Sequence, residues 1–156
     1  MSRSDVHPLR EILERMLVKY LTVRPKGFLL ADDRRLETTI QARILGYGGA
    51  RTLYRGRQPQ CRSLDGIKSM TPKGRECSEC PNRSRCIPQV RLDLFVEQLP
   101  FRLLLSFTNA RNFLEYCAKL KRRDTSLEEI LHRIDVVDRG SWGELRFAAI
   151  RSPSND

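Results

Sequence analysis

The sequence predicts a mainly β domain with helices, of the α+β class. Several segments alternate apolar and polar residues with a period of two, which is typical of half-buried strands. Four of the five cysteines fall between Cys61 and Cys86, in a stretch with too few apolar residues to build a core of its own. The first observation predicts a sheet. The second predicts a module that needs another means of stabilisation.

Residues 1–22 are predicted to form an N-terminal helix, followed by a β domain at 23–150 and a short polar tail at 151–156. The apolar residues of the first segment fall on one helical stripe: Leu9, Ile12, Leu13, Met16 and Tyr20. Such a helix either packs on the domain or offers a surface for a protein partner or a second copy of the chain.

The first clear strand is predicted from Thr39 to Tyr47. Its apolar residues share one face: Ile40, Ala42 and Ile44. Its other face carries Gln41, Arg43 and Tyr47. The glycines between positions 46 and 49 are expected to bend or break this strand, and extended structure resumes over 51–55.

More strands and a helix follow the cysteine-rich stretch. Segments 90–96 and 101–107 should pair as an antiparallel hairpin through a turn that contains Pro100. Thr108 or Asn109 can cap a helix that runs to about Arg122, with Cys117 as a small residue of its core-facing stripe. Strands over 130–136 and 145–149 flank a hairpin turn, and His132 within the first of them is expected to have a structural role.

The element order is strand, cysteine module, strand, strand, helix, strand, strand. An OB-fold, a five-stranded barrel with a helix between its third and fourth strands, has this order. We therefore predict an OB-fold-like domain over 23–150, with the module inserted at about residues 57–89 between the first two strands.

The spacing Cys-x15-Cys-x2-Cys-x5-Cys predicts a metal site formed by Cys61, Cys77, Cys80 and Cys86. The ion would be structural, because four protein ligands leave no open position for a substrate. Zinc is favoured, and an iron–sulfur cluster is the alternative because similar spacing occurs in cluster-bearing nucleases. Disulfides are disfavoured by the odd number of cysteines and by the lack of a secretory signal at the N-terminus.

The charge pattern predicts a nucleic-acid partner. The formal net charge is +10, and residues 41–91 contribute +8 of it, mostly through arginine. Arginine binds phosphate bidentately and stacks on bases, and a sheet face that carries arginine and aromatic side chains suits a single strand. The predicted contact residues are Gln41, Arg43, Tyr47, Arg51, Tyr54, Arg55, Arg57, Arg62, Lys68, Lys73, Arg91, Phe95, Arg102 and Trp142.

Several local motifs strengthen this prediction. They are Arg51-Thr-Leu-Tyr-Arg55, Cys61-Arg-Ser-Leu-Asp-Gly66, Cys77-Ser-Glu-Cys80-Pro81 with Cys86, the strand that begins at Arg91, and the helix that contains Asn109 to Tyr116. Over residues 37–150 the chain resembles zinc-containing OB-fold single-stranded-DNA-binding proteins of phages and mobile genetic elements. The resemblance implies zinc at the four cysteines and single-stranded DNA as ligand, with RNA as the alternative.

The last residues differ from those of bacterial single-strand binders, which end in an acidic tail that recruits partners. Ser152 to Asp156 is too short and too weakly acidic for that role. Partner recruitment would then use another surface, such as the N-terminal helix.

Together these patterns predict a non-catalytic, cytoplasmic protein that binds single-stranded DNA in replication, recombination or mobility of a phage or mobile element. The carboxylate pairs Asp32–Asp33 and Glu128–Glu129 do not form a catalytic pair, because neighbouring side chains point apart. No membrane partner is expected, since no apolar run approaches the roughly 20 residues of a membrane span. The alternatives are a zinc-ribbon adaptor or transcription regulator, and an iron–sulfur subunit of a nuclease-like complex.

Overall fold

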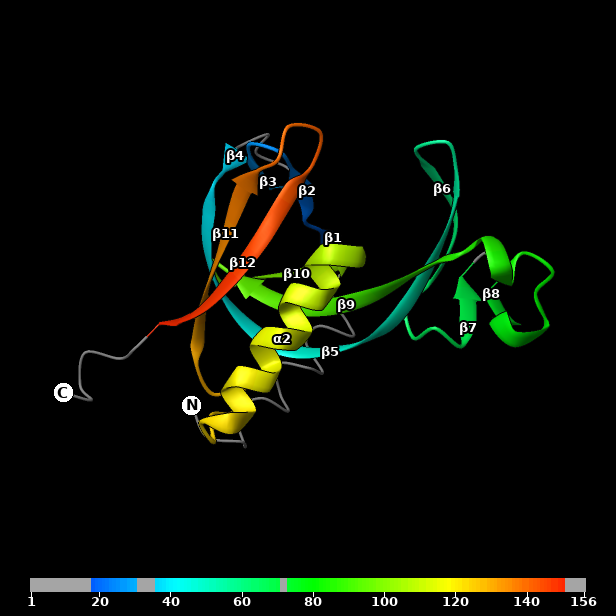
Figure 1. Cartoon of the computed structure of the whole chain (residues 1–156). Helices are drawn as coiled ribbons and strands as arrows, with labels where there is room; N and C mark the ends of the chain where they lie inside the picture. The colour runs from blue at the N-terminus through cyan, green and yellow to red at the C-terminus, as the bar shows by residue number, and fades with distance from the viewer. Residues whose placement is uncertain (1–17, 31–35, 71–72, 151–156) are drawn as a thin grey trace.

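The computed structural model describes residues 18–30, 36–70 and 73–150, and over these ranges the chain is mainly β with one α-helix, as the α+β prediction requires (Figure 1). The helix is α2 (Phe107–Arg122), and no helix within these ranges is long and apolar enough to cross a membrane. Two short 3₁₀ helices are η1 (Cys77–Glu79) and η2 (Arg83–Arg85). The strands are β1 (Lys19–Tyr20), β2 (Thr22–Arg24), β3 (Gly27–Leu29), β4 (Leu36–Glu37), β5 (Thr39–Arg55), β6 (Gln58–Ser63), β7 (Lys68–Met70), β8 (Lys73–Glu76), β9 (Ile87–Val96), β10 (Leu99–Leu105), β11 (Leu131–Asp138) and β12 (Gly143–Ile150).

Strand β5 organises the main sheet. The strand order is β1-β10-β9-β5-β11-β12, and β6 also pairs with β5. The 17 residues of β5 pair with β11 at the N-terminal end, with β9 along the middle and with β6 at the C-terminal end. Figure 1 shows β5 and β9 running together out of the body of the sheet to the segment that holds β6, β7 and β8. These two strands therefore carry the cysteine module.

The beginning of the described chain differs from the prediction. Residues 1–17 of the predicted helix lie outside the described residues, but β1 and β2 are extended, so a helix that continues to residue 22 is wrong. Strand β1 pairs in parallel with β10, and the Leu21 N–H donates to the Arg102 carbonyl at 2.8 Å. Backbone partners offered by the edge of β10 override the helical spacing of this short segment.

A β-bulge changes the face assignment along β5. The strand continues through its glycines instead of breaking, and its register with β9 shifts between Ile44 and Gly46, which leaves Leu45 as the extra residue. Tyr47 consequently lies opposite the buried Leu92, and its ring centroid is 5.2 Å from that of Phe113. The prediction that Tyr47 shares a face with Gln41 and Arg43 is wrong, because one inserted residue reverses the alternation.

Both predicted hairpins are confirmed. Strands β9 and β10 are joined by Glu97 and Gln98, which have φ values of 50° and 65°, as a two-residue type I′ turn requires. Pro100 therefore lies within β10 and not in the turn. In the second hairpin, Gly143 of β12 pairs with Asp138 of β11, and a Cβ at position 143 would approach the Arg24 carbonyl oxygen of β2 to 2.6 Å. Only glycine allows β2 to pack this closely.

The core lies between the sheet and α2. Its side chains come from β3, β5, β9–β12 and the helix, and Cys117 packs against its edge as predicted. The largest of the fully buried apolar side chains are Phe28, Phe113, Ile44, Leu45, Leu92, Leu94, Leu103, Leu105, Ile134 and Leu145.

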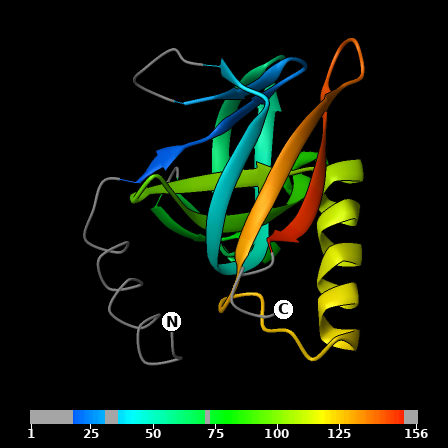
Figure 2. The same ribbon diagram turned by 90° about the vertical axis from the view of Figure 1, so that its left-hand side faces the viewer.

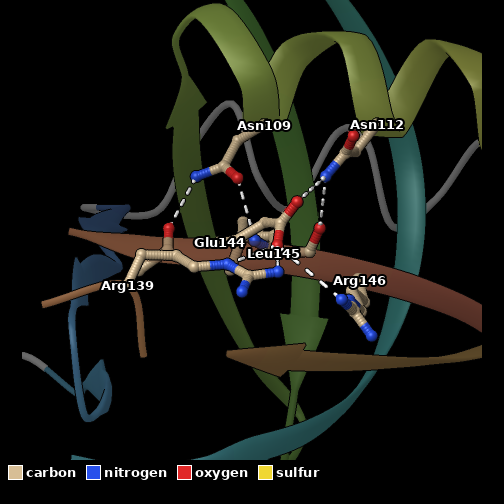
Figure 3. Close-up of polar contacts among 7 residues, drawn as sticks. Asn109, Asn112, Arg139, Glu144, Leu145 and Arg146 are labelled. Atoms are coloured by element: carbon tan, nitrogen blue, oxygen red, sulfur yellow. Dashed lines mark hydrogen bonds and ion pairs between the residues drawn. The ribbon is translucent and has the colours of Figure 1, made fainter. Parts of the chain in front are cut away.

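The outer edge of β12 is covered by the helix. No pairing of β12 with β10 closes a barrel within the described ranges, and α2 stands beside β12 in both ribbon views (Figures 1 and 2). Asn109 Nδ2 donates to the Gly143 carbonyl at 3.0 Å, and its Oδ1 accepts from the Leu145 N–H at 2.8 Å (Figure 3). Asn112 Nδ2 donates to the Leu145 carbonyl at 3.0 Å. The two amides thus take the place of a neighbouring strand, and Ser106 occupies the N-cap position that was predicted for Thr108 or Asn109.

His132 has the structural role that was predicted. Its side chain is fully buried, its Nε2 lies 2.7 Å from the Leu127 carbonyl oxygen, and its Nδ1 lies 2.6 Å from the Tyr116 hydroxyl. Because a carbonyl can only accept, Nε2 carries the proton and Nδ1 accepts from Tyr116. Burial lowers the pKa of His132, although the bond to Leu127 acts in the opposite direction.

Replacement of Asn109 tests the role of the amide at the β12 edge. Asn109→Ala leaves the N–H of Leu145 and the carbonyl of Gly143 without their partner, so we expect a loss of about 1–3 kcal/mol in the free energy of unfolding. Urea denaturation measures it. Lys119→Ala, an exposed change on the same helix, is the control and should stay within about 0.5 kcal/mol. Equal stabilities of the two variants would contradict this role.

The buried imidazole predicts a loss of stability in mild acid. The unfolded chain binds a proton at His132 near pH 6.5 while the folded chain binds it only at lower pH, so stability is full above pH 6.5 and falls below it. The free energy of unfolding should fall by at most about 1.4 kcal/mol for each pH unit. Urea unfolding from pH 7.5 to 5.5 measures the slope. In His132→Gln the free energy of unfolding should lose the part of its pH dependence that His132 contributes. An unchanged pH dependence in that variant would show that other groups cause it.

Candidate nucleic-acid interface and cysteine module

The cysteine module is more ordered than its loop-like sequence suggests. Strand β6 pairs with the C-terminal end of β5. Strands β7 and β8 then pair with each other as a second hairpin, and the two 3₁₀ helices follow. The Cys80 N–H donates to the Cys77 carbonyl at 3.2 Å, and the Cys86 N–H donates to the Arg83 carbonyl at 3.2 Å. With these two tight turns, the last three cysteines lie at the same cavity as Cys61 of β6.

All four predicted ligands line one cavity of about 190 Å³: Cys61, Cys77, Cys80 and Cys86. All four are free thiols. Burial raises the pKa of Cys86, and the proximity of Cys80, Cys61 and Cys77 raises it further. Within the described ranges, however, no three histidine, cysteine or acidic side chains meet at the spacing of metal ligands. The donor set fits a four-thiolate site, and the sulfurs would have to draw together to bind an ion.

Four arginine residues also line this cavity, namely Arg51, Arg62, Arg75 and Arg83. Four thiolates around a divalent ion carry a net charge of about −2, so neighbouring guanidinium groups favour such a site. Arg51 acts in this direction and lowers the pKa of Cys86, against the larger effect of burial. The sequence prediction did not single out Arg75 and Arg83, although the density of arginine between the cysteines pointed to them.

Asp65 fixes the loop that joins β6 to β7. Its Oδ1 accepts from the Ser63 hydroxyl at 3.0 Å and from the N–H groups of Ile67 at 2.8 Å and Lys68 at 2.9 Å. The two backbone bonds are the main reason that the pKa of Asp65 is lowered. Sequence reasoning did not assign this role, although an Asp-Gly pair in a polar loop is a known signal for such a turn.

The structure brings three of the predicted contact residues together. Gln41, Arg43 and Phe95 line a groove of about 480 Å³ at the end of β5 and β9, next to the β9–β10 turn. Arg43 lies directly opposite Phe95 in the β5–β9 register. Glu37 and Glu97 line the same groove, so its charge is mixed.

Three other predicted residues lie on the same side of the sheet and are engaged with neighbouring side chains. Asp93 pairs with Arg91 at 3.4 Å and with Arg102 at 3.6 Å. Arg62 stacks on Tyr20, with its guanidinium carbon 4.6 Å from the ring centroid. Tyr20 was assigned to the N-terminal helix, and no local sequence signal indicated this contact.

The remaining predicted contact residues lie at separate places. Tyr54 is half-buried near the end of β5, and Arg55 and Arg57 are exposed at the β5–β6 turn. Lys68 is exposed on β7, and Lys73 begins β8 with its side chain outside the described part. Trp142 is 41% exposed at the tip of the β11–β12 hairpin. No single continuous surface of all the predicted residues follows from these positions.

Removal of one cysteine tests the module. Cys80→Ser should abolish the binding of about one equivalent of zinc and raise hydrogen exchange over residues 58–86, because a four-thiolate site does not tolerate the loss of a ligand. Metal analysis and hydrogen-exchange mass spectrometry measure the two effects. Cys117→Ser, which changes the cysteine at the core, is the control and should keep its zinc. Full zinc content in Cys80→Ser would contradict the site.

Comparisons with protein-family models, with curated proteins and with solved structures find no match to this chain. The functional assignment therefore rests on the geometry of the groove, the charge of the sheet face and the cysteine module.

Proposed function

We propose that this chain is a non-catalytic protein that binds single-stranded DNA across the face formed by β5, β9 and β10. The observation that carries the proposal is the groove lined by Gln41, Arg43 and Phe95. A guanidinium directly opposite an aromatic ring gives a phosphate contact beside a stacking surface, which is the combination that binds single strands without sequence preference.

The strand order supports an OB-like domain as the scaffold. The neighbours β10-β9-β5-β11-β12 follow the order 3-2-1-4-5 of an OB barrel, and α2 lies between its third and fourth strands in the chain. Phe95 of the groove lies on β9, the second of these strands, and OB domains bind oligonucleotides on the face of their second and third strands. In a closed barrel the fifth strand, here β12, would pair with the third strand, β10. In this proposal the side-chain amides of Asn109 and Asn112 bind the backbone of β12 in place of that pairing.

The cysteine module is proposed as a structural zinc site. The shared cavity of the four cysteines and its arginine lining support zinc bound as a thiolate complex. Bound zinc would hold the module at the ends of β5 and β9 as one wall of the binding surface. It leaves no open position for chemistry.

A comparison of single-stranded and duplex DNA tests the proposed function. We expect the full chain to bind a labelled single-stranded oligonucleotide more tightly than a duplex of equal length, with affinity that falls as salt rises. Fluorescence anisotropy measures both. Tighter binding of the duplex, or binding of neither, would refute the proposal.

A matched pair of substitutions tests the groove. Phe95→Ala should weaken single-strand binding by about 1–3 kcal/mol, because it removes a stacking surface, and Phe95→Tyr should retain most of the affinity. Leu114→Ala changes a residue of α2 that is 48% exposed and should leave binding unchanged. Thermal unfolding of each variant confirms that the fold is intact. A loss of affinity in Leu114→Ala as large as that in Phe95→Ala would contradict the assignment.

A further inference from the structure

A ring of contacts surrounds part of the same sheet face. Arg62 stacks on Tyr20, and Tyr20 of β1 is paired in register with Arg102 of β10. Arg102 and Arg91 both pair with Asp93. Arg91 Nη1 in turn donates to the Leu64 carbonyl, two residues beyond Arg62. The ring therefore joins the first described strand, the centre of the sheet and the cysteine module.

The floor of this ring carries almost no side chains. Gly46 of β5 lies opposite Asp93, and Gly48 lies opposite Arg91. A Cβ at position 48 would lie 3.2 Å from Arg91 Nη2, so the guanidinium lies on the bare backbone of that residue. Glycine at position 48 thus allows the Arg91 guanidinium to lie close against the sheet.

The ring has a surplus of positive charge. It holds three guanidinium groups, of Arg62, Arg91 and Arg102, and one carboxylate, that of Asp93. The Nε atoms of all three arginines are buried and make no hydrogen bond within the described residues, although those of Arg91 and Arg102 lie 3.4 Å and 3.6 Å from the Asp93 carboxylate. Buried charged donors without a hydrogen bond are costly, and an anion that reaches them offsets this cost. The side chains of Arg91 and Arg102 are still 21% and 29% exposed, so a ligand can reach them.

We propose that Arg62, Arg91 and Arg102 form a binding site for one backbone phosphate of the bound strand, and that Asp93 competes with this phosphate for Arg91 and Arg102. The inference rests on the proposed single-strand binding and identifies the residues that supply its electrostatic contribution. Three guanidinium groups on one face, connected through Tyr20 and Asp93, suit the several oxygens of a phosphodiester. Asp93 occupies two of them in the free protein and holds them in place until the phosphate arrives.

Opposite effects of two substitutions distinguish this site from a purely structural ion pair. Arg102→Gln should weaken binding of fluorescein-labelled oligodeoxythymidylate about tenfold and reduce the slope of log affinity against log salt by about 0.7, the value for one phosphate contact with a single strand. Asp93→Asn should instead strengthen binding about threefold, because it removes a negative charge and releases two arginines.

The control uses a second carboxylate with the same arrangement. Glu144 also bridges two arginines, Arg139 at 2.6 Å and Arg146 at 3.9 Å, but on β12 (Figure 3). Glu144→Gln changes the net charge as Asp93→Asn does and should leave affinity near that of the unchanged chain. Equal gains in the two variants would reduce the effect to net charge and overturn the site.

Two further measurements complete the test. An abasic oligonucleotide should show the same loss with Arg102→Gln, and a loss confined to oligonucleotides with bases would overturn the phosphate assignment. Thermal unfolding checks each variant, and Arg62→Gln serves as a second probe if Arg102→Gln does not fold. If the unchanged chain binds single strands but neither arginine substitution weakens binding, this site is wrong and the proposed function stands. If the unchanged chain does not bind single strands, both fail.

Discussion

The antiparallel pairing of β5 with β9 is the interaction on which the rest of the structure depends. It runs from Arg43 to Thr52 on β5 and extends beyond the body of the sheet. Near the N-terminal end of β5 this pairing places Arg43 opposite Phe95 in the groove. At the C-terminal end of β5 it holds both connections to the cysteine module. A buried polar chain strengthens this outer part, in which Thr52 donates to Gln89 at 2.6 Å and Gln89 donates to Ser106 at 2.9 Å.

The bulge at Leu45 lets one pair of strands serve two purposes. Before the bulge, Ile40, Ala42 and Ile44 face the core. After it the alternation reverses, so that Tyr47 meets Phe113 on the helix side and Gly48 lies under Arg91 on the other. If the alternation continued through Leu45 without a bulge, Tyr47 would lie on the face of the arginine ring and Gly48 on the face of the helix. The bulge therefore both packs α2 and clears the floor of the proposed phosphate site.

The polar interactions divide into those that maintain the fold and those that remain available for a ligand. The amides of Asn109 and Asn112 and the imidazole of His132 are engaged with backbone groups at short distances, and they join α2 and the loop before β11 to the sheet. Arg62, Arg91 and Arg102 of the sheet face are less completely satisfied, since their buried Nε atoms make no hydrogen bond within the described residues. Among the described side chains of the ring, Asp93 supplies the one carboxylate, and the proposed phosphate site depends on this surplus of positive charge.

The alternation of residues along the chain was sufficient to predict most of the sheet. Segments 39–47 and 90–96, the hairpin around Arg139 and the helix up to Arg122 form as their patterns indicate. Segment 101–107 is a strand only up to Leu105, and Phe107, which was predicted to belong to it, begins the helix. The metal site predicted from the cysteine spacing stays a prediction, because the four cysteines line one cavity but no three of them lie at the spacing of metal ligands within the described residues. The alternating patterns succeed because each depends on burial of one face of one element, which neighbouring residues already specify.

Tertiary structure alone decided the remaining features. The strand at Lys19 forms because the edge of β10 offers backbone partners, and that edge is remote in sequence. The bulge depends on a register that only the pairing with β9 defines. The ring of Tyr20, Arg62, Arg91, Asp93 and Arg102 combines side chains from four strands, so no local pattern could indicate it. The sequence by itself determined which residues face inward along the regular strands, as far as the bulge in β5, and which carry charge, because periodicity and side-chain chemistry are local. Which charges meet was decided by strand register, which is a property of the whole sheet.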